Sequence, residues 1–127
     1  MNETIKKISP AFEDARGVIS NILEEEISHV AIITSRKGSI RGNHYHPKQF
    51  QYADLIRREY ESVSKSMNDP KSKEERLTVC PGDLVITPPM IAHAMRFLED
   101  SLFLNLTTGN RNSEEFKEHT KEFKLIK

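Results

Sequence analysis

The sequence predicts a small all-β protein built from short strands, and three observations carry that prediction. The chain has 127 residues, which fits one domain that buries about two-thirds of the surface of its unfolded chain. Its apolar residues come in short runs, broken by Gly, Pro, Asn and Asp as in strands joined by turns. About nine such runs, closely spaced and without an internal repeat, are typical of a sandwich or barrel. We therefore expect a single domain over residues 1–127, with a core barrel at about 15–108.

The expected strands follow the apolar runs in order. They are Val18–Leu23, His29–Ser35, Gly38–Arg41, Gln51–Ile56, Tyr60–Ser64, Arg76–Cys80, Leu84–Thr87, Ile91–Leu98 and Leu102–Leu106. Residues 68–71 form the polar tip of a long hairpin, and Pro81-Gly82-Asp83 forms a tight turn. Only Ser113–Lys121 has a helical pattern, with Ser113 as its N-cap, so we expect a short C-terminal helix or a solvated tail.

Composition excludes several classes of function. Nineteen basic residues balance nineteen acidic ones, so no overall charge favours nucleic acid or an anionic membrane. No apolar run approaches the ~20 residues that a transmembrane helix needs, and the first residues lack the apolar core of a secretory signal. The expected location is the cytoplasm. The one cysteine, Cys80, lies in an apolar run and is interpreted as a small packed side chain.

Histidines supply the candidate site. Alternate side chains of a strand share one face, so in an extended segment His44 and His46, two residues apart, would project together. Gln51 opens the next strand, and His93 lies in a later apolar strand where an imidazole needs a polar partner. Two imidazoles on one face can bind a metal ion or present two bases to a substrate. On spacing alone, the alternative of two exposed loop histidines stays open. We assign no function to His29 or His119.

The motifs around these histidines resemble those of the cupin superfamily. The spacing of the two cupin motifs is matched by Gly38, His44, His46, Gln51 and Arg58, and then by Gly82, Pro88-Pro89-Met90 and His93. This resemblance covers residues 38–97 and implies a cupin double-stranded β-helix, which is a jelly-roll barrel. Gln51 stands where the motif has a glutamate, which weakens a metal site. Arg58 and Met90 stand where it has glycines, and we expect that change to alter only the turn geometry.

Two further segments resemble one branch of that superfamily. Asp14-Ala15-Arg16-Gly17 is similar to the D-x-R-G segment of nucleotide-sugar epimerases and isomerases. The string RGNHYHPKQFQ, residues 41–51, is similar to the R-G-x-H segment of dTDP-4-dehydrorhamnose 3,5-epimerases and to the longer pattern of dTDP-sugar 3,4-ketoisomerases. It is also similar to a segment of zinc-binding capsular-sugar reductases. His93 departs from the ketoisomerase pattern, where an arginine is expected.

This resemblance implies an isomerase or epimerase that acts on a nucleotide-linked 4-keto-hexose in surface or capsular sugar biosynthesis. The reaction moves the acidic proton beside the ketone, and imidazole is a suitable base near neutral pH. His44 is our choice as the base and His46 as its partner or the second proton carrier, and Arg41 or a bound metal would stabilise the enolate. Arg16 holds a phosphate of the nucleotide, and Gln51 contacts the substrate. This reaction needs no cofactor.

Two alternatives remain beside the isomerase. In a metal-binding cupin, His44, His46, His93 and Gln51 would hold a divalent Zn, Ni, Mn or Fe ion for oxygenase, Lewis-acid or structural purposes. In a sugar-binding cupin, the same pocket would bind its ligand without chemistry. A small-molecule nucleotide sugar is the expected partner, with no nucleic acid or membrane. A homodimer is expected because small barrels expose edge strands that a second copy can cover.

Overall fold

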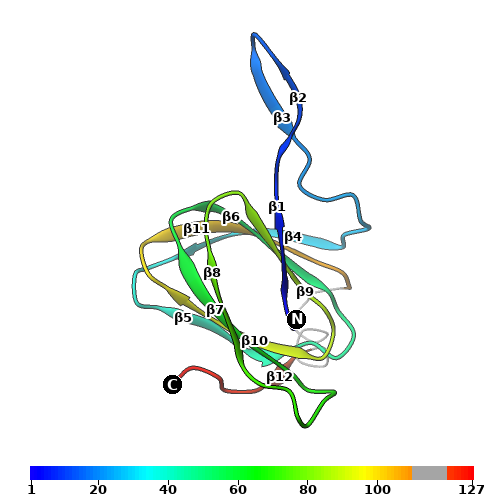
Figure 1. The fold of residues 1–127 in the computed structure, drawn as a ribbon, viewed down its shortest axis with the longest axis vertical. Coiled ribbons are helices and arrows are strands. Elements are labelled where there is room, and N and C mark those ends of the chain that lie inside the picture. The colour runs from blue at the N-terminus through cyan, green and yellow to red at the C-terminus, as the bar shows by residue number, and fades with distance from the viewer. Residues whose placement is uncertain (110–119) are drawn as a thin grey trace.

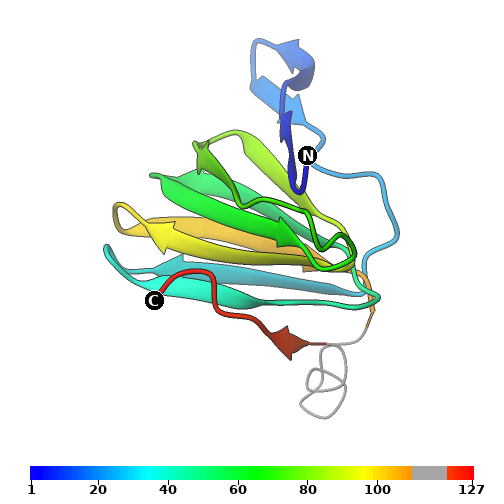
Figure 2. The same cartoon turned by 60° about the horizontal axis from the view of Figure 1, so that its bottom comes forward.

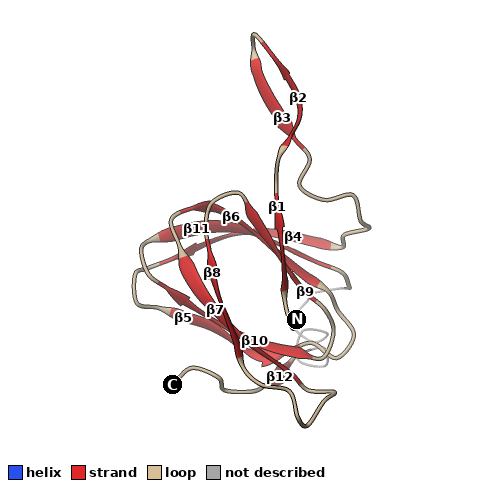
Figure 3. Ribbon diagram, viewed as in Figure 1, coloured by secondary structure: helices blue, strands red, loops and turns tan. Residues whose placement is uncertain are grey.

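The computed structural model describes residues 1–109 and 120–127, and all of the regular elements in these residues are strands (Figure 3). Most of them lie close to the runs expected from the sequence. The strands are β1 Thr4–Lys7, β2 Pro10–Asp14, β3 Gly17–Ser20, β4 His29–Ser35, β5 Ile40–Tyr45, β6 Gln51–Arg57, β7 Tyr60–Ser66, β8 Glu75–Val79, β9 Asp83–Thr87, β10 Ile91–Phe97, β11 Ser101–Thr107 and β12 Lys121–Glu122. Among the described residues, no helix is long and apolar enough to cross a membrane.

The strands form two antiparallel sheets that face each other. One sheet has the order β1-β9-β6-β11-β4 and the other has the order β12-β5-β10-β7-β8. Consecutive strands alternate between the sheets at β4, β5 and β6, and again at β9, β10 and β11 (Figures 1 and 2). This connectivity is that of a double-sheet jelly roll. The predicted all-β jelly-roll barrel is therefore confirmed.

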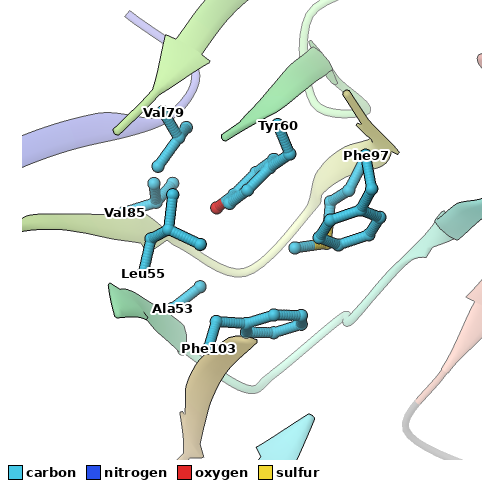
Figure 4. Packing of buried hydrophobic residues seen from close by; sticks show 8 residues of the cluster. Ala53, Leu55, Tyr60, Val79, Val85, Phe97 and Phe103 are labelled. Carbon is cyan, nitrogen blue, oxygen red and sulfur yellow. The ribbon is translucent and has the colours of Figure 1, made fainter. Parts of the chain in front are cut away.

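An apolar core fills one end of the space between the sheets (Figure 4). Leu55 and Phe103 come from the first sheet, and Tyr60 and Phe97 come from the second. All four are no more than 2% exposed, and Phe97 stacks on Phe103 with ring centroids 5.8 Å apart. Each such side chain contributes about 1.5–3 kcal/mol through the apolar surface that it buries. This core joins the two sheets and leaves the other end of the barrel to polar residues.

The hairpin of β2 and β3 lies away from the barrel. Both strands are exposed throughout, and Figures 1 and 2 show them projecting beyond the end of the two sheets. Three of their exposed side chains are large and apolar: Phe12, Val18 and Ile19. An exposed apolar arm of this kind is typical of a segment that packs on another surface.

The structure also differs from the expectations at several places. β1 and β2 were not predicted, because short runs with two or three polar residues carry little strand signal. β1 joins the first sheet beside β9, outside the expected limits of the barrel. The expected helix at Ser113–Lys121 lies outside the described residues except for its last two, of which Lys121 opens β12. The single-domain boundaries stay a prediction.

The two residues that replace motif glycines both have a positive φ, and the expected change of turn geometry stays a prediction. Arg58 has a φ of 74° and Met90 a φ of 67°, which is the left-handed region that glycine adopts without strain. Met90 is held there because its N–H donates to the carbonyl of His46 at 2.9 Å and its carbonyl accepts from Met67. Each such non-glycine residue costs about 1 kcal/mol, which the rest of the fold offsets.

Candidate functional site

The three histidines of the two motifs come together inside the barrel. β5 and β10 are antiparallel neighbours, and His93 pairs with His44 in their register. Their Nε2 atoms are 3.2 Å apart, and the rings of His44 and His46 have centroids 4.8 Å apart. His46 and His93 are each 2% exposed, whereas His44 is half-buried. The predicted convergence of three imidazoles on one interior space is therefore observed in the structure.

The backbone of β5 makes this approach possible. Gly42 has a φ of 83°, and a Cβ atom at this position would lie 2.7 Å from the carbonyl oxygen of His93. The register between the two strands also shifts between His93 and Ala94. Only glycine allows β5 to lie so close to β10 at this point. Gly42 of the R-G-x-H segment thus allows the strand that carries His44 to approach the strand that carries His93.

A pocket of about 160 Å³ opens beside the paired imidazoles. It is lined by Ile33, Arg41, Gly42, His44, Gln51, His93, Met95, Phe103 and Asn105. A cavity of about 150 Å³ accommodates one benzene-sized ring, so this pocket fits a single sugar ring but no nucleotide. The chemistry available in it is that of imidazole, amide and guanidinium groups against an apolar wall.

Arg41 and Gln51 both line this pocket, as expected for groups that contact a substrate. The Arg41 side chain is exposed and is held by two donated hydrogen bonds, to the Ser35 hydroxyl at 2.7 Å and the Thr34 carbonyl at 2.8 Å. The Gln51 Oε1 and Asn105 Oδ1 atoms are buried without a hydrogen-bond partner in the described part of the chain. Such atoms are costly unless a ligand or water pairs with them. Asn105 was not predicted, since nothing marks it within an apolar strand.

Two predicted residues, His46 and Arg16, do not line this pocket. His46 is buried behind His44, whereas Arg16 lies far from the pocket. It lies on the projecting hairpin, where its guanidinium donates to the Asp14 carboxylate at 2.6 Å. The Arg16 side chain and backbone N–H hold the pKa of Asp14 below its usual value. Arg16 borders a separate shallow surface with Phe12, Val18 and their neighbours. Within one chain, Arg16 therefore cannot serve the histidine pocket.

A buried carboxylate, Glu3, was not predicted and reaches His93 from the N-terminal segment. Glu3 is 1% exposed, and its Oε2 atom lies 3.5 Å from the His93 Nδ1 atom. Ser62 donates a hydrogen bond to Oε1, and Thr87 donates one to Oε2 at 2.6 Å. Burial raises the pKa of Glu3, but the interactions with His93, Ser62 and Thr87 outweigh it and lower the pKa. No short motif could reveal this contact, because it joins residues ninety positions apart in the chain.

The C-terminal segment packs on the outer side of the histidine strand. β12 pairs with β5, and the hydroxyl oxygen of Thr120 lies 3.3 Å from the His46 Nδ1 atom. The Asn43 side chain accepts from the backbone of Leu125 and Ile126, at 2.8 and 3.0 Å. Because these contacts bracket His44 in the sequence, the segment helps to hold β5 in place.

The histidine geometry also fits a metal ion. The ligand nitrogens of His44, His46 and His93 all lie within 4.8 Å of one another. Two nitrogens bound to one tetrahedral ion at about 2.0–2.1 Å would be about 3.3 Å apart, close to the observed His44–His93 distance. Gln51 lines the same pocket. The three histidines therefore fit a divalent ion, and Gln51 as a fourth ligand stays a prediction.

The fold is similar to that of solved sugar-nucleotide enzymes. A dTDP-4-dehydrorhamnose 3,5-epimerase from Sulfolobus tokodaii is 23% identical with a TM-score of 0.75, and the match covers 96% of this chain and 77% of that one. A 3,4-ketoisomerase from Thermoanaerobacterium thermosaccharolyticum, solved with TDP, is 22% identical with a TM-score of 0.74 over 94% and 86% of the chains. A TDP-fucose-3,4-ketoisomerase from Campylobacter jejuni is 19% identical with a TM-score of 0.75 over 91% and 87%. No protein-family model and no curated protein matches the sequence. These likenesses establish the fold.

The close approach at Gly42 gives a testable prediction with an internal control. Gly38 and Gly42 both have a positive φ, but a Cβ atom at Gly38 would meet nothing within 4 Å. Gly38→Ala should therefore cost about 1 kcal/mol of unfolding free energy through backbone strain alone. Gly42→Ala should cost about 3 kcal/mol, since the new methyl group also pushes β5 away from β10. Urea unfolding of both variants measures the difference, and equal losses would contradict the close approach.

Proposed function

We propose that this protein is an isomerase or epimerase of a nucleotide-linked 4-keto-hexose. The observation that carries the proposal is the pair of facing imidazoles, His44 and His93, beside a pocket of about 160 Å³. The likeness of the fold to enzymes of this class supports it. A cytoplasmic location and a part in surface-polysaccharide synthesis remain predictions that accompany this function.

The proposed chemistry is a proton transfer beside the sugar ketone. The C–H bond next to a carbonyl is acidified, and a neutral imidazole can accept its proton without a large change of its pKa. His44 lines the pocket and is our choice as the base. The electron pair of the broken C–H bond moves onto the ketone oxygen, and Arg41 stabilises the resulting enolate. Return of a proton to the opposite face of the same carbon gives the epimer. Delivery of the proton to the former carbonyl carbon gives the shifted ketone, provided that the enolate oxygen gains a proton and the neighbouring hydroxyl group loses one. His46 is our choice as the second proton carrier for these transfers.

Substrate recognition then divides between the pocket and the region outside it. The sugar ring fits the pocket, where the unpaired carbonyl oxygens of Gln51 and Asn105 would accept hydrogen bonds from its hydroxyl groups. The nucleotide is too large for this space and must lie outside. Its phosphates need a cation, and arginine binds phosphate in a two-pronged geometry.

We propose that Arg16 supplies this cation to the pocket of a second copy, within a homodimer. Arg16 lies on a projecting hairpin whose apolar side chains, Phe12, Val18 and Ile19, are all more than half exposed. A second exposed apolar surface lies on the outer face of β4, where Val30 is 60% and Ile32 is 71% exposed. Burying both surfaces between two copies would remove large apolar areas from water.

Deuterium exchange tests the proton transfer directly. The protein is incubated in D₂O with a dTDP-4-keto-6-deoxyhexose, and deuterium at C3 and C5 is followed by NMR or mass spectrometry. We expect exchange at one of these carbons that falls at least 100-fold in His44→Ala, since a general base contributes about 10²–10⁴-fold. Binding of the sugar with exchange no faster than in His44→Ala would instead support a sugar-binding protein and would refute the proposed reaction.

Mixing two inactive variants tests the contribution of the second copy. Arg16→Ala should lose phosphate binding, and His44→Ala should lose the base, so each alone should be nearly inactive. If Arg16 serves the partner's pocket, a mixed dimer carries one site with both residues intact. We therefore expect activity to return on mixing after subunit exchange, with about a quarter of the wild-type sites restored. Light scattering that shows a monomer, or a mixture that stays inactive, would exclude this arrangement.

A metal-binding cupin is the second candidate, because the three imidazoles have the spacing of metal ligands. A bound ion would act as a Lewis acid at the substrate oxygen. We expect that protein purified without a histidine tag and supplemented with Zn, Ni, Mn or Fe will show its metal preference by elemental analysis. Stoichiometric metal that disappears in both His46→Ala and His93→Ala would support this candidate. Metal-free protein with full exchange activity would refute it.

A further inference from the structure

We propose that Glu3 is a positioning residue that fixes the tautomer and the orientation of His93. It thereby determines which of the two rings, His93 or His44, donates the hydrogen in the contact between them. The consequence for catalysis rests on the proposed function, whereas the positioning itself rests on geometry alone. Neither Glu3 nor His93 belongs to the catalytic residues assigned above.

Glu3 bridges the two sheets at the histidine end of the barrel. It directly precedes β1, whose first residue, Thr4, pairs with Ile86 in the first sheet. Its carboxylate accepts a hydrogen bond from Thr87 of that sheet at 2.6 Å. On the opposite sheet it accepts a hydrogen bond from Ser62 and lies 3.5 Å from His93. A single buried side chain therefore connects β9 to β7 and β10.

The partners of this carboxylate determine where the proton of His93 lies. Two hydroxyl groups already donate to Glu3, and an ionised carboxylate accepts hydrogen bonds only. The carboxylate, 3.5 Å away, attracts an N–H group on His93 Nδ1 and repels a lone pair there, so this geometry favours a hydrogen on Nδ1. A neutral imidazole has one N–H group, so its second nitrogen, Nε2, then carries a lone pair. The partner of one ring nitrogen thus sets the state of the other.

This tautomer determines which nitrogen donates in the contact between His93 and His44. The His93 Nε2 atom lies 3.2 Å from the His44 Nε2 atom, and one of the two nitrogens must donate. With a lone pair on His93, the donor is His44 Nε2–H. A proton taken up by the pair during catalysis can then be shared over two rings, with the negative charge of Glu3 behind them. Replacing a residue that orients a ligand or base in this way typically lowers activity about 10- to 100-fold.

The test uses two substitutions of Glu3 and a matched control. Glu3→Leu removes the acceptor at a similar size, and Glu3→Gln keeps an oxygen acceptor without the charge. Asp83→Asn is the control, because Asp83 is also a carboxylate that is 1% exposed but pairs with Lys7 instead of a histidine. All proteins are treated with EDTA and labelled with ¹⁵N-histidine, and His93 is assigned with a His93→Gln variant.

We expect NMR of the wild type and of Asp83→Asn to show the His93 proton on Nδ1. Glu3→Leu should shift that proton towards Nε2 and lower kcat about 10- to 100-fold. KM should change little, because Glu3 does not line the sugar pocket. Glu3→Gln should recover part of the kcat. Asp83→Asn should lower the unfolding temperature while kcat keeps its wild-type value.

The proposal is overturned if His93 of the wild type carries its proton on Nε2, or if Glu3→Leu keeps both the Nδ1 proton and the wild-type kcat. Should Glu3→Leu fail to fold, a Glu3→Gln variant with unchanged kcat overturns it as well. A wild type that exchanges no proton of any keto-sugar refutes the proposed function. The tautomer measured by NMR then still decides the positioning by Glu3 on its own.

Discussion

The site depends on one backbone constraint, the pairing of β5 with β10 at the level of His44 and His93. His44 and His93 meet because their strands are neighbours and the register places the two residues opposite each other. Gly42 allows the close contact, and the hydrogen bonds of Asn43 to the C-terminal segment hold the outer side of β5. Slippage by one residue would turn His44 away from the interior, and both the proton transfer and the metal alternative would be lost.

The barrel interior is divided along the strands into an apolar end and a polar end. On β10 the inward residues pass from His93 to Phe97, and on β6 they pass from Gln51 to Leu55. The polar end holds groups that are costly to bury, including Glu3 and the unpaired side-chain oxygen of Gln51. The apolar end offsets this cost through packing of its large side chains (Figure 4). A stable core at one end thus permits a reactive, incompletely paired site at the other.

The parts of this arrangement that the sequence predicted are those with local signals. Alternation of side chains places His44 and His46 together, and motif spacing relates them to His93 across the barrel. The strands β4 to β11 follow apolar runs and were predicted within a few residues of their ends. Glu3 and Asn105 carry no such signal, because their importance comes only from contacts made by distant strands. A single acidic residue near the N-terminus has no pattern that distinguishes it from the solvated acids of the same chain.

Arg16 illustrates a different limit of sequence reasoning. Its D-x-R-G segment was recognised, but a motif does not tell whether its side chain serves its own pocket or that of a neighbour. The fold gives a physical reason for the second choice, since the hairpin extends away from the barrel (Figure 1). Its large apolar side chains are also exposed.

The central claim is that facing imidazoles and a sugar-sized pocket form one reactive site. A crystal structure with a bound nucleotide-linked keto-sugar tests it most directly. The account predicts density for the sugar ring in the pocket, with the carbon beside the ketone next to His44 and the His93 ring directly behind. Imidazole rings that diverge towards bulk solvent, or a sugar bound elsewhere on the barrel, would contradict it.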